Sequence, residues 1–236
     1  MNICLTGGSG RLGTELQGLR RYTYAPTSRE MEVSDYDSVM EYLAPRGIDL
    51  IVHAAAYTAV EKAEIEKERC YAVNVTGTKN IAEAGIPVLY ISTEYVFDGE
   101  HGGYKEDDVP NPKNYYALTK VLGEHVLNPW SKTIRLVFKP RPWPFEGAFD
   151  DQFTGGDYVD LMAKEVDKVI TAYERVTKLP RILHLGTGRK SVYDLAKQTR
   201  DVKAISRFGV SAKLPRDTSL DTSLWEKIKK ENGLEA

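Results

Sequence analysis

The sequence predicts an α/β fold with a doubly wound parallel sheet and a small C-terminal part. Three observations predict it. Short apolar runs alternate with longer helical patterns, a glycine-rich loop follows the first run, and proline-dense chain follows residue 137. We therefore expect one domain in residues 1–137 and a smaller part in residues 138–236 that is interwoven with it.

The apolar runs predict strands, and the patterns between them predict helices. Asp35 and Asn114 stand immediately before two of the helical patterns and are expected to cap them. We expect strands at residues 2–5, 22–25, 49–54, 88–91, 133–137 and 182–185. We expect helices at residues 11–19, 36–43, 66–84, 115–127, 158–173, 192–199 and 223–232.

The chain from residue 138 to residue 157 is predicted to be a long loop. Pro140, Pro142 and Pro144 lie close together at its start, and proline disfavours both helix and central strand. A loop of this length in a compact domain is usually functional or disordered. We place the boundary between the two parts of the chain here.

Composition excludes several classes of partner. The 236 residues include 32 Lys+Arg and 34 Asp+Glu, a formal net charge of −2, which gives no electrostatic case for nucleic acid or an anionic membrane. No apolar run approaches the roughly 18 residues of a membrane helix, and no signal-peptide core is evident. Cys4 and Cys70 provide neither a disulfide framework nor a metal site, so we expect a cytoplasmic protein without a bound metal.

The glycine-rich loop predicts a dinucleotide site. Gly8, Gly10 and Gly13 fit the pattern G-x-G-x-x-G, and Gly7, Gly10 and Gly13 fit its variant G-x-x-G-x-x-G. Glycine allows a tight strand-to-helix turn and a close approach to a pyrophosphate at the helix N-terminus. Because no Gly-Lys-Ser/Thr ends the motif, a P-loop is excluded, and the fold is expected to be of the Rossmann type.

The end of the second predicted strand favours NADPH over NADH, although NADH remains possible. A carboxylate there would bind the adenosine ribose hydroxyls, whereas arginine accepts a 2′-phosphate. Ser28 and Arg29 occupy these positions, and the first carboxylate is Glu30. A solvated surface arginine is the alternative interpretation.

Tyr116 and Lys120 lie four residues apart on a predicted helix. An ammonium close to a tyrosine stabilises the phenolate and lowers its pKa, which suits the pair to acid–base catalysis. Upstream, a buried strand ends in Ser92 and Thr93, at the sheet edge where such folds place their sites. A hydroxyl there is able to hydrogen-bond the carbonyl that the tyrosine protonates.

These motifs resemble the extended short-chain dehydrogenase/reductases and, within them, the dTDP-4-dehydrorhamnose reductase family. The resemblance covers nearly the whole chain in order. The matching stretches are residues 7–13, 53–64, 74, 77–78, 92–99, 110–120, 151–153, 158–160 and 220–223. Three features depart from the family pattern: His53 replaces a usual Asn, Glu94 replaces a usual Asp, and the chain is shorter between residues 137 and 157.

The resemblance implies NADPH-dependent reduction of the C4 ketone of a 4-keto-6-deoxy nucleotide sugar. The implied catalytic residues are Thr93, Tyr116 and Lys120, and the implied sugar contacts are Val60, Thr93, Glu94 and Tyr116. Residues 1–137 would bind NADP and residues 138–236 the substrate. The expected cofactor-binding residues are Gly7, Gly10, Arg11, Leu12, Gly13, Ser28, Arg29, Glu32, Val33, Ala56, Tyr57, Thr58, Tyr116 and Lys120.

Two other functions stay open. One is a bifunctional 3,5-epimerase/4-reductase, which would use a histidine and a cysteine as further acid–base groups. The other is a non-catalytic NADP-binding regulatory subunit. A sugar-nucleotide dehydratase is disfavoured because Glu94-Tyr95 supplies only one carboxylate after Thr93. The helix at residues 115–127 is a candidate surface for a homodimer.

Overall fold

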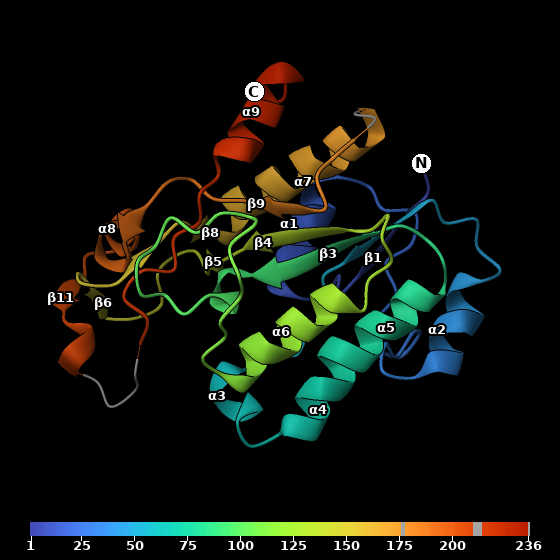
Figure 1. Cartoon of the computed structure of the whole chain (residues 1–236), viewed down its shortest axis with the longest axis horizontal. Coiled ribbons are helices and arrows are strands. Elements are labelled where there is room, and N and C mark those ends of the chain that lie inside the picture. The colour runs from blue at the N-terminus through green and yellow to red at the C-terminus, as the bar shows by residue number, and fades with distance from the viewer. Residues whose placement is uncertain (176–177, 210–213, 236) are drawn as a thin grey trace.

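The computed structural model describes residues 1–175, 178–209 and 214–235. Its centre is a parallel sheet of five strands, so the predicted parallel α/β fold is confirmed (Figure 1). Across the sheet the strands follow in the order β1 (Ile3–Thr6), β2 (Leu50–His53), β3 (Val88–Thr93), β4 (Lys132–Leu136) and β9 (Ile182–His184).

The expected strand at residues 22–25 is reduced to a single parallel bridge between Tyr24 and Cys4. The Leu5 N–H donates to the Tyr24 carbonyl over 2.9 Å, so the segment still follows the free edge of β1. Because β2 lies on the other side of β1, the chain reverses direction across the sheet between these two strands. In open α/β sheets, ligands bind at the carboxyl ends of the strands at such a switch point.

Helices cover both faces of the sheet (Figure 1). Asp35 and Asn114 cap α2 and α6 through their side chains, as predicted. One face carries α1 (Arg11–Leu19), α7 (Val159–Arg175) and α9 (Ser223–Glu231). The other carries α2 (Tyr36–Leu43), α4 (Lys67–Tyr71), α5 (Gly77–Glu83) and α6 (Tyr115–His125), with the short α3 (Val60–Ala63) beside α6.

Alternate residues of each strand face these two layers, as the pleat requires. On β1, Leu5 packs in the cluster with α1 and α7, whereas Cys4 packs in the cluster with α2 and α5. On β3, Leu89 and Tyr90 divide between the same two clusters. The sheet is therefore buried on both faces, and its polar groups are available to ligands only at the strand ends.

The predicted helix at residues 66–84 is not continuous. The helices α4 and α5 are joined by a π-helical turn at Ala72–Thr76. This turn carries Asn74, whose buried side chain contacts the chain after β2. Single π turns often accompany functional sites, because they redirect side chains that a regular helix would place elsewhere.

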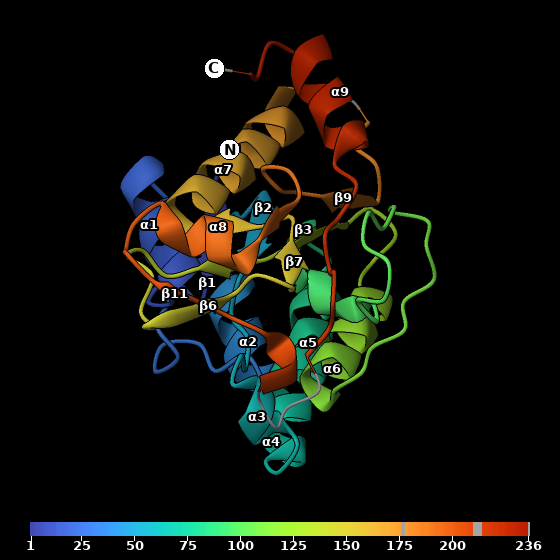
Figure 2. The same ribbon diagram turned by 90° about the vertical axis from the view of Figure 1, so that its left-hand side faces the viewer.

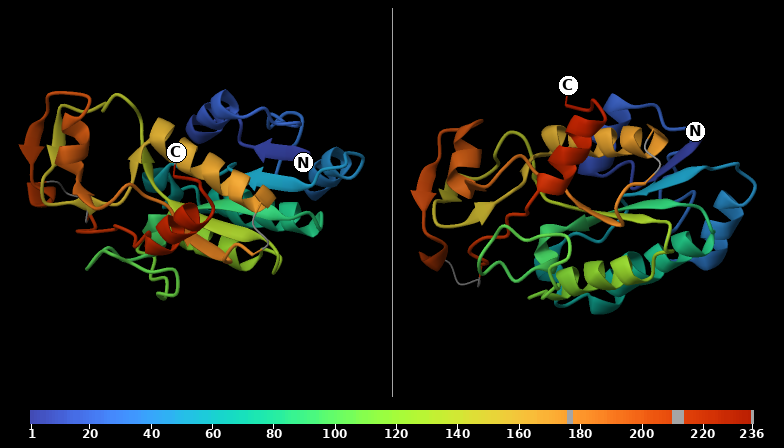
Figure 3. Two further views of the ribbon diagram at one scale, coloured as in Figure 1. Left: turned by 90° about the horizontal axis from the view of Figure 1, so that it is seen from above. Right: turned by 45° about the horizontal axis from the view of Figure 1, so that its top comes forward.

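The prediction of a long loop at residues 138–157 is wrong in part, because four very short strands occur in this segment. They form the main part of a small outer lobe that extends past one end of the sheet (Figures 2 and 3). Trp143 is buried in the core of this lobe. The strands are β5 (Phe138–Lys139), β6 (Gly147–Phe149), β7 (Phe153–Thr154) and β8 (Asp157–Tyr158), joined in the lobe by β10 (Lys190–Ser191), α8 (Val192–Lys197) and β11 (Lys203–Ile205).

Candidate active site

The glycine loop connects β1 to α1 and has no room for side chains. Gly7 has a φ of +72°, and a Cβ on it would stand 2.6 Å from the Ala55 nitrogen. A Cβ on Gly13 would stand 2.2 Å from the Gly7 carbonyl oxygen. The first hydrogen bond along α1 runs from the Thr14 N–H to Gly10, so the N–H groups of residues 11–13 are left for an anion.

The expected 2′-phosphate residues lie in an exposed turn after the Tyr24 bridge. Ser28 and Arg29 are both exposed. Glu30 is occupied locally, since its carboxylate accepts hydrogen bonds from the Thr27 N–H at 2.8 Å and the Thr27 hydroxyl at 2.9 Å. The carboxylate nearest to Arg29 in sequence is thus turned toward Thr27.

Val33, one of the expected cofactor-binding residues, lies against the start of α5. Val33 is buried, and its carbonyl accepts a hydrogen bond from the Asn80 side chain at 3.0 Å. Glu32 is exposed and binds the Ser34 hydroxyl at 2.8 Å.

The chain after β2 lies against the glycine loop, as the contact between Gly7 and Ala55 requires. Asn74 holds this chain by both ends of its amide: the side-chain oxygen accepts from the Tyr57 N–H at 2.8 Å, and the side-chain nitrogen donates to the Tyr57 carbonyl at 3.1 Å. Ala56 is half-buried and Thr58 is exposed. The structure thus brings the chain that carries the expected cofactor-binding residues Ala56, Tyr57 and Thr58 beside the glycine loop.

The three expected catalytic residues come together from β3 and α6. Thr93 ends β3, which packs against the helix α6 that carries Tyr116. Burial raises the pKa of Tyr116, and the Thr93 hydroxyl acts in the opposite direction. Tyr115 lies elsewhere, with its ring 5.4 Å from the Lys67 ammonium on α4. The geometry therefore distinguishes two adjacent tyrosines that the sequence separates only by spacing.

Lys120 is buried on the same helix and is 2% exposed. Burial lowers its pKa to about 7, although Glu124 opposes this. Its ammonium stands 4.0 Å from the centre of the Tyr90 ring. Burial is the main cause of the raised pKa of Tyr116, and Lys120 is not among the groups that shift it.

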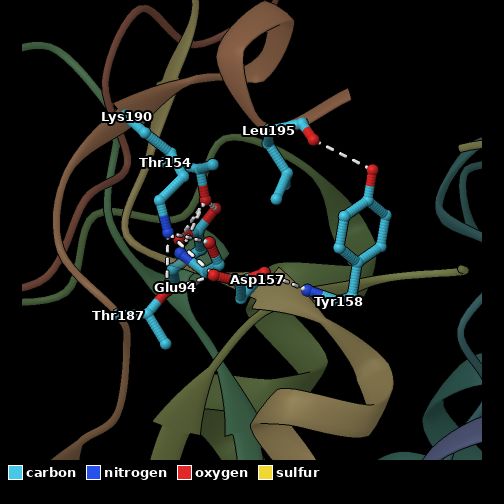
Figure 4. A network of polar contacts seen from close by, with 8 residues as sticks. Glu94, Thr154, Asp157, Tyr158, Thr187, Lys190 and Leu195 are labelled. Carbon is cyan, nitrogen blue, oxygen red and sulfur yellow. Dashed lines mark hydrogen bonds and ion pairs between the residues drawn. The ribbon is translucent and has the colours of Figure 1, made fainter. Parts of the chain in front are cut away.

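Glu94 follows Thr93 and reaches the outer lobe. Its carboxylate accepts hydrogen bonds from Thr218 at 2.5 Å and Thr154 at 3.3 Å, and burial raises its pKa to about 7. Figure 4 shows it beside a second network, in which Asp157 pairs with Lys190 at 2.9 Å. No sequence pattern indicates that Thr154 and Thr218 contact Glu94. Val60, the other expected sugar contact, begins α3 and is half-buried.

Together the fold and this group of residues define a Rossmann-type α/β protein of the short-chain dehydrogenase/reductase class. The profile of the family described as RmlD substrate binding domain matches residues 1–138. The chain belongs to this family.

Similar proteins agree with this assignment. A dTDP-4-dehydrorhamnose reductase of Mycobacterium tuberculosis is 33% identical over 178 residues, which cover 69% of this chain and 55% of that protein. One of Aggregatibacter actinomycetemcomitans is 37% identical over 135 residues, covering 53% and 46%. The chain thus spans about half the length of the curated relatives it matches.

Solved structures match over a larger share. A hypothetical dTDP-4-dehydrorhamnose reductase from Sulfolobus tokodaii has a TM-score of 0.81 at 32% identity, covering 97% of this chain and 94% of that one. The Bacillus anthracis reductase, solved in complex with NADP, has a TM-score of 0.81 at 26% identity, covering 98% and 91%. Within the described residues, no helix is both long and apolar enough to span a membrane.

Proposed function

We propose that the protein reduces the C4 ketone of a 4-keto-6-deoxy nucleotide sugar with NADPH, a reaction of the dTDP-4-dehydrorhamnose to dTDP-rhamnose type. The observation that carries the proposal is the packing of α6, which bears Tyr116 and Lys120, against β3, which ends at Thr93 at the carboxyl edge of the sheet. The names of the similar reductases support the same reaction and substrate class.

The residues present fit a dinucleotide. A side chain at Gly7 would collide with the Ala55 backbone and one at Gly13 with the Gly7 carbonyl, so both glycines keep the turn tight, and the first N–H groups of α1 are left for an anion there. Arg11 and Leu12 would supply two of those N–H groups. Bound NADPH would supply the hydride that C4 accepts.

Tyr116 then acts as the acid. The phenol is protonated at neutral pH and would donate its proton to the C4 oxygen as the carbonyl becomes an alkoxide. The Thr93 hydroxyl accepts the Tyr95 N–H at 3.2 Å and, with the ketone bound, would donate its own O–H to the same oxygen. The positive form of Lys120 stabilises the phenolate that remains.

NADPH is the proposed cofactor, and NADH is the weaker alternative. Arg29 and Ser28 are exposed in the turn where the 2′-phosphate would lie, and a guanidinium and a hydroxyl both suit that group.

The chemistry of the cysteines favours reduction without epimerisation. Burial raises the pKa of Cys4 to about 12 and also raises that of Cys70. Neither thiol is therefore suited to act as a thiolate base at neutral pH. The presence of Thr93, Tyr116 and Lys120 together argues against a purely regulatory NADP-binding subunit.

We also propose a cytoplasmic homodimer. Both cysteines are free, in keeping with a reducing compartment. Leu118 lies on the outer side of α6 and is 39% exposed, which makes this helix a candidate dimer surface. Sedimentation of wild type and Leu118→Glu tests it: we expect a dimer that the charge dissociates.

The reductase proposal is tested by NADPH oxidation in the presence of a dTDP-4-keto-6-deoxy sugar. We expect loss of NADPH absorbance that depends on the sugar, with a dTDP-6-deoxy sugar bearing a C4 hydroxyl as product. Tight NADPH binding with no turnover of the sugar would identify a non-catalytic NADP-binding subunit instead.

A further inference from the structure

His53, the last residue of β2, is the centre of a chain of hydrogen bonds that joins the end of β1 to α5. Its Nδ1 lies 2.7 Å from the Thr6 hydroxyl at the end of β1, and its Nε2 lies 3.2 Å from the Thr78 hydroxyl on α5. The Thr6 oxygen also accepts the Ala55 N–H at 3.2 Å. The Thr78 hydroxyl donates to the Asn74 carbonyl at 2.7 Å.

These contacts allow only one arrangement of protons for a neutral ring. The Asn74 carbonyl can only accept, so the Thr78 hydroxyl proton is committed to it. Thr78 therefore accepts from the Nε2–H of His53, and the unprotonated Nδ1 accepts from the Thr6 hydroxyl. Every polar hydrogen in this series of hydrogen bonds then has an acceptor.

Burial holds the ring in this neutral form. His53 is fully buried, and burial lowers its pKa to about 3, with the charge of Lys120 acting in the same direction. A second proton on Nδ1 would remove the acceptor of the Thr6 hydroxyl as well as place a charge in the interior.

The chain leads into the rest of the site. At one end, Thr6 precedes the glycine loop, and its oxygen holds the chain after β2 through Ala55. At the other end, the Asn74 side chain holds Tyr57 and donates to the Thr119 hydroxyl at 3.0 Å. Thr119 lies next to Lys120 on α6.

We propose that His53 is a positioning residue, whose neutral Nε2–H form sets the spacing between the glycine loop and the chain after β2 for cofactor binding. The contact between His53 and Thr6 would govern NADPH affinity, because Thr6 precedes the glycine loop and its hydroxyl oxygen also holds the chain after β2. The Thr78 contact would act through Asn74 on Tyr57 and α6. This inference rests on the proposed use of NADPH.

Two substitutions separate the two contacts. The amide oxygen of His53→Asn lies near the position of Nδ1 and keeps the Thr6 contact, whereas the amide nitrogen of His53→Gln reaches the position of Nε2 and keeps the Thr78 contact. We expect His53→Gln to weaken NADPH binding about tenfold, the usual effect of a lost buried hydrogen bond, and His53→Asn to bind nearly as wild type. In turnover, we expect His53→Asn to lower kcat more than it raises the KM for NADPH.

Fluorescence titration with NADPH measures the binding, and thermal melting is recorded alongside it. His184→Gln is the matched control, because His184 is equally buried but bonds the Tyr104 carbonyl at 3.0 Å, away from the glycine loop. We expect it to lose stability and to keep its NADPH affinity. If His53→Gln does not fold, Thr6→Val removes the same contact from the other side, with Thr6→Ser as its hydroxyl-bearing control.

The titrations separate this inference from the proposed function. Wild-type protein that binds neither NADPH nor NADH would refute both. Wild-type protein that binds NADPH while His53→Gln, or Thr6→Val in its place, binds it equally well would overturn the role of His53 alone. A loss of affinity that simply follows the loss of melting temperature, in His184→Gln as in His53→Gln, would also overturn it.

Discussion

Lys120 and Glu124 lie one turn apart on the buried side of α6, and burial lowers the pKa of Lys120 to about 7 even though Glu124 opposes this fall. The Glu124 carboxylate is mainly engaged elsewhere, accepting from two nitrogens of Arg135 at 2.7 and 3.0 Å. Burial therefore disfavours the charged form of Lys120 in the fold, and Glu124 compensates for it only in part.

This burial predicts that Lys120→Met stabilises the protein while it lowers turnover. The folded pKa of Lys120 lies below its unfolded value of 10.5, so its ammonium destabilises the fold as the pH falls from 10.5 toward 7. We expect a gain of about 2–4 kcal/mol in the free energy of unfolding at pH 7. Denaturant unfolding measures the gain, and NADPH oxidation measures the loss of activity.

Lys229→Met is the matched control and should lower the free energy of unfolding instead of raising it. Although burial opposes it, hydrogen bonds to Glu226 and Glu165 raise the pKa of Lys229. Removing this cation leaves Glu165 without its 3.0 Å partner, and we expect a loss of about 2–4 kcal/mol. Destabilisation of both variants would contradict the idea that the Lys120 charge is unfavourable in the fold.

Tyr116→Phe should lower kcat by roughly 10²–10⁴-fold, the range typical of a lost general acid, and leave NADPH affinity nearly unchanged. The reason is that the phenol at this position is protonated and lies beside Thr93. Tyr115→Phe is the control, because that ring lies on the Lys67 side of α6. Steady-state kinetics check both variants, and an active Tyr116→Phe enzyme would refute Tyr116 as the acid.

Arg29→Ala should raise the KM for NADPH roughly tenfold or more and leave that for NADH unchanged, since only NADPH carries the 2′-phosphate that a charge-assisted bond would hold. The ratio of kcat/KM for the two cofactors measures the effect. Arg200→Ala removes an equally exposed arginine from the outer lobe and should change neither value. An equal loss of kcat/KM with both cofactors would mean that Arg29 does not bind the 2′-phosphate.

The order of strands and helices could be predicted because it depends on local patterns. Apolar runs such as residues 88–91 and capped helices such as the one after Asn114 carry their signals within a few residues. The prediction of a strand at residues 22–25 was wrong, because this segment pairs with β1 only through the single bridge between Tyr24 and Cys4. The π turn at Ala72–Thr76 carries no local sequence signal, and only the backbone of the folded chain reveals it.

The glycine loop and the pair formed by Tyr116 and Lys120 could be predicted from the sequence for the same reason, since each is a motif of fixed spacing. The partners of Glu94 could not be predicted, because Thr154 and Thr218 are 60 and 124 residues away from it in sequence. Composition and periodicity say nothing about such contacts, which depend on how the outer lobe meets the sheet. The roles of the individual site residues and the division of the chain after residue 137 stay predictions.

Glu94→Gln should make the stability of the protein less dependent on pH. Burial raises the pKa of Glu94 to about 7 from 4.5, so the wild-type carboxyl favours folding below pH 4.5 and loses that contribution as the pH rises to 7. Relative to wild type, Glu94→Gln should gain about 3 kcal/mol across this interval and no more above it. Denaturant unfolding between pH 4.5 and pH 8 measures the difference. Glu165→Gln is the control: hydrogen bonds from Trp225 and Lys229, acting against burial, lower the pKa of Glu165, so its contribution to stability changes only below about pH 4.5 and its difference from wild type should stay constant between pH 4.5 and pH 8. A constant difference between Glu94→Gln and wild type over this range would mean that burial does not raise the pKa of Glu94 and that its carboxylate is ionised in the fold.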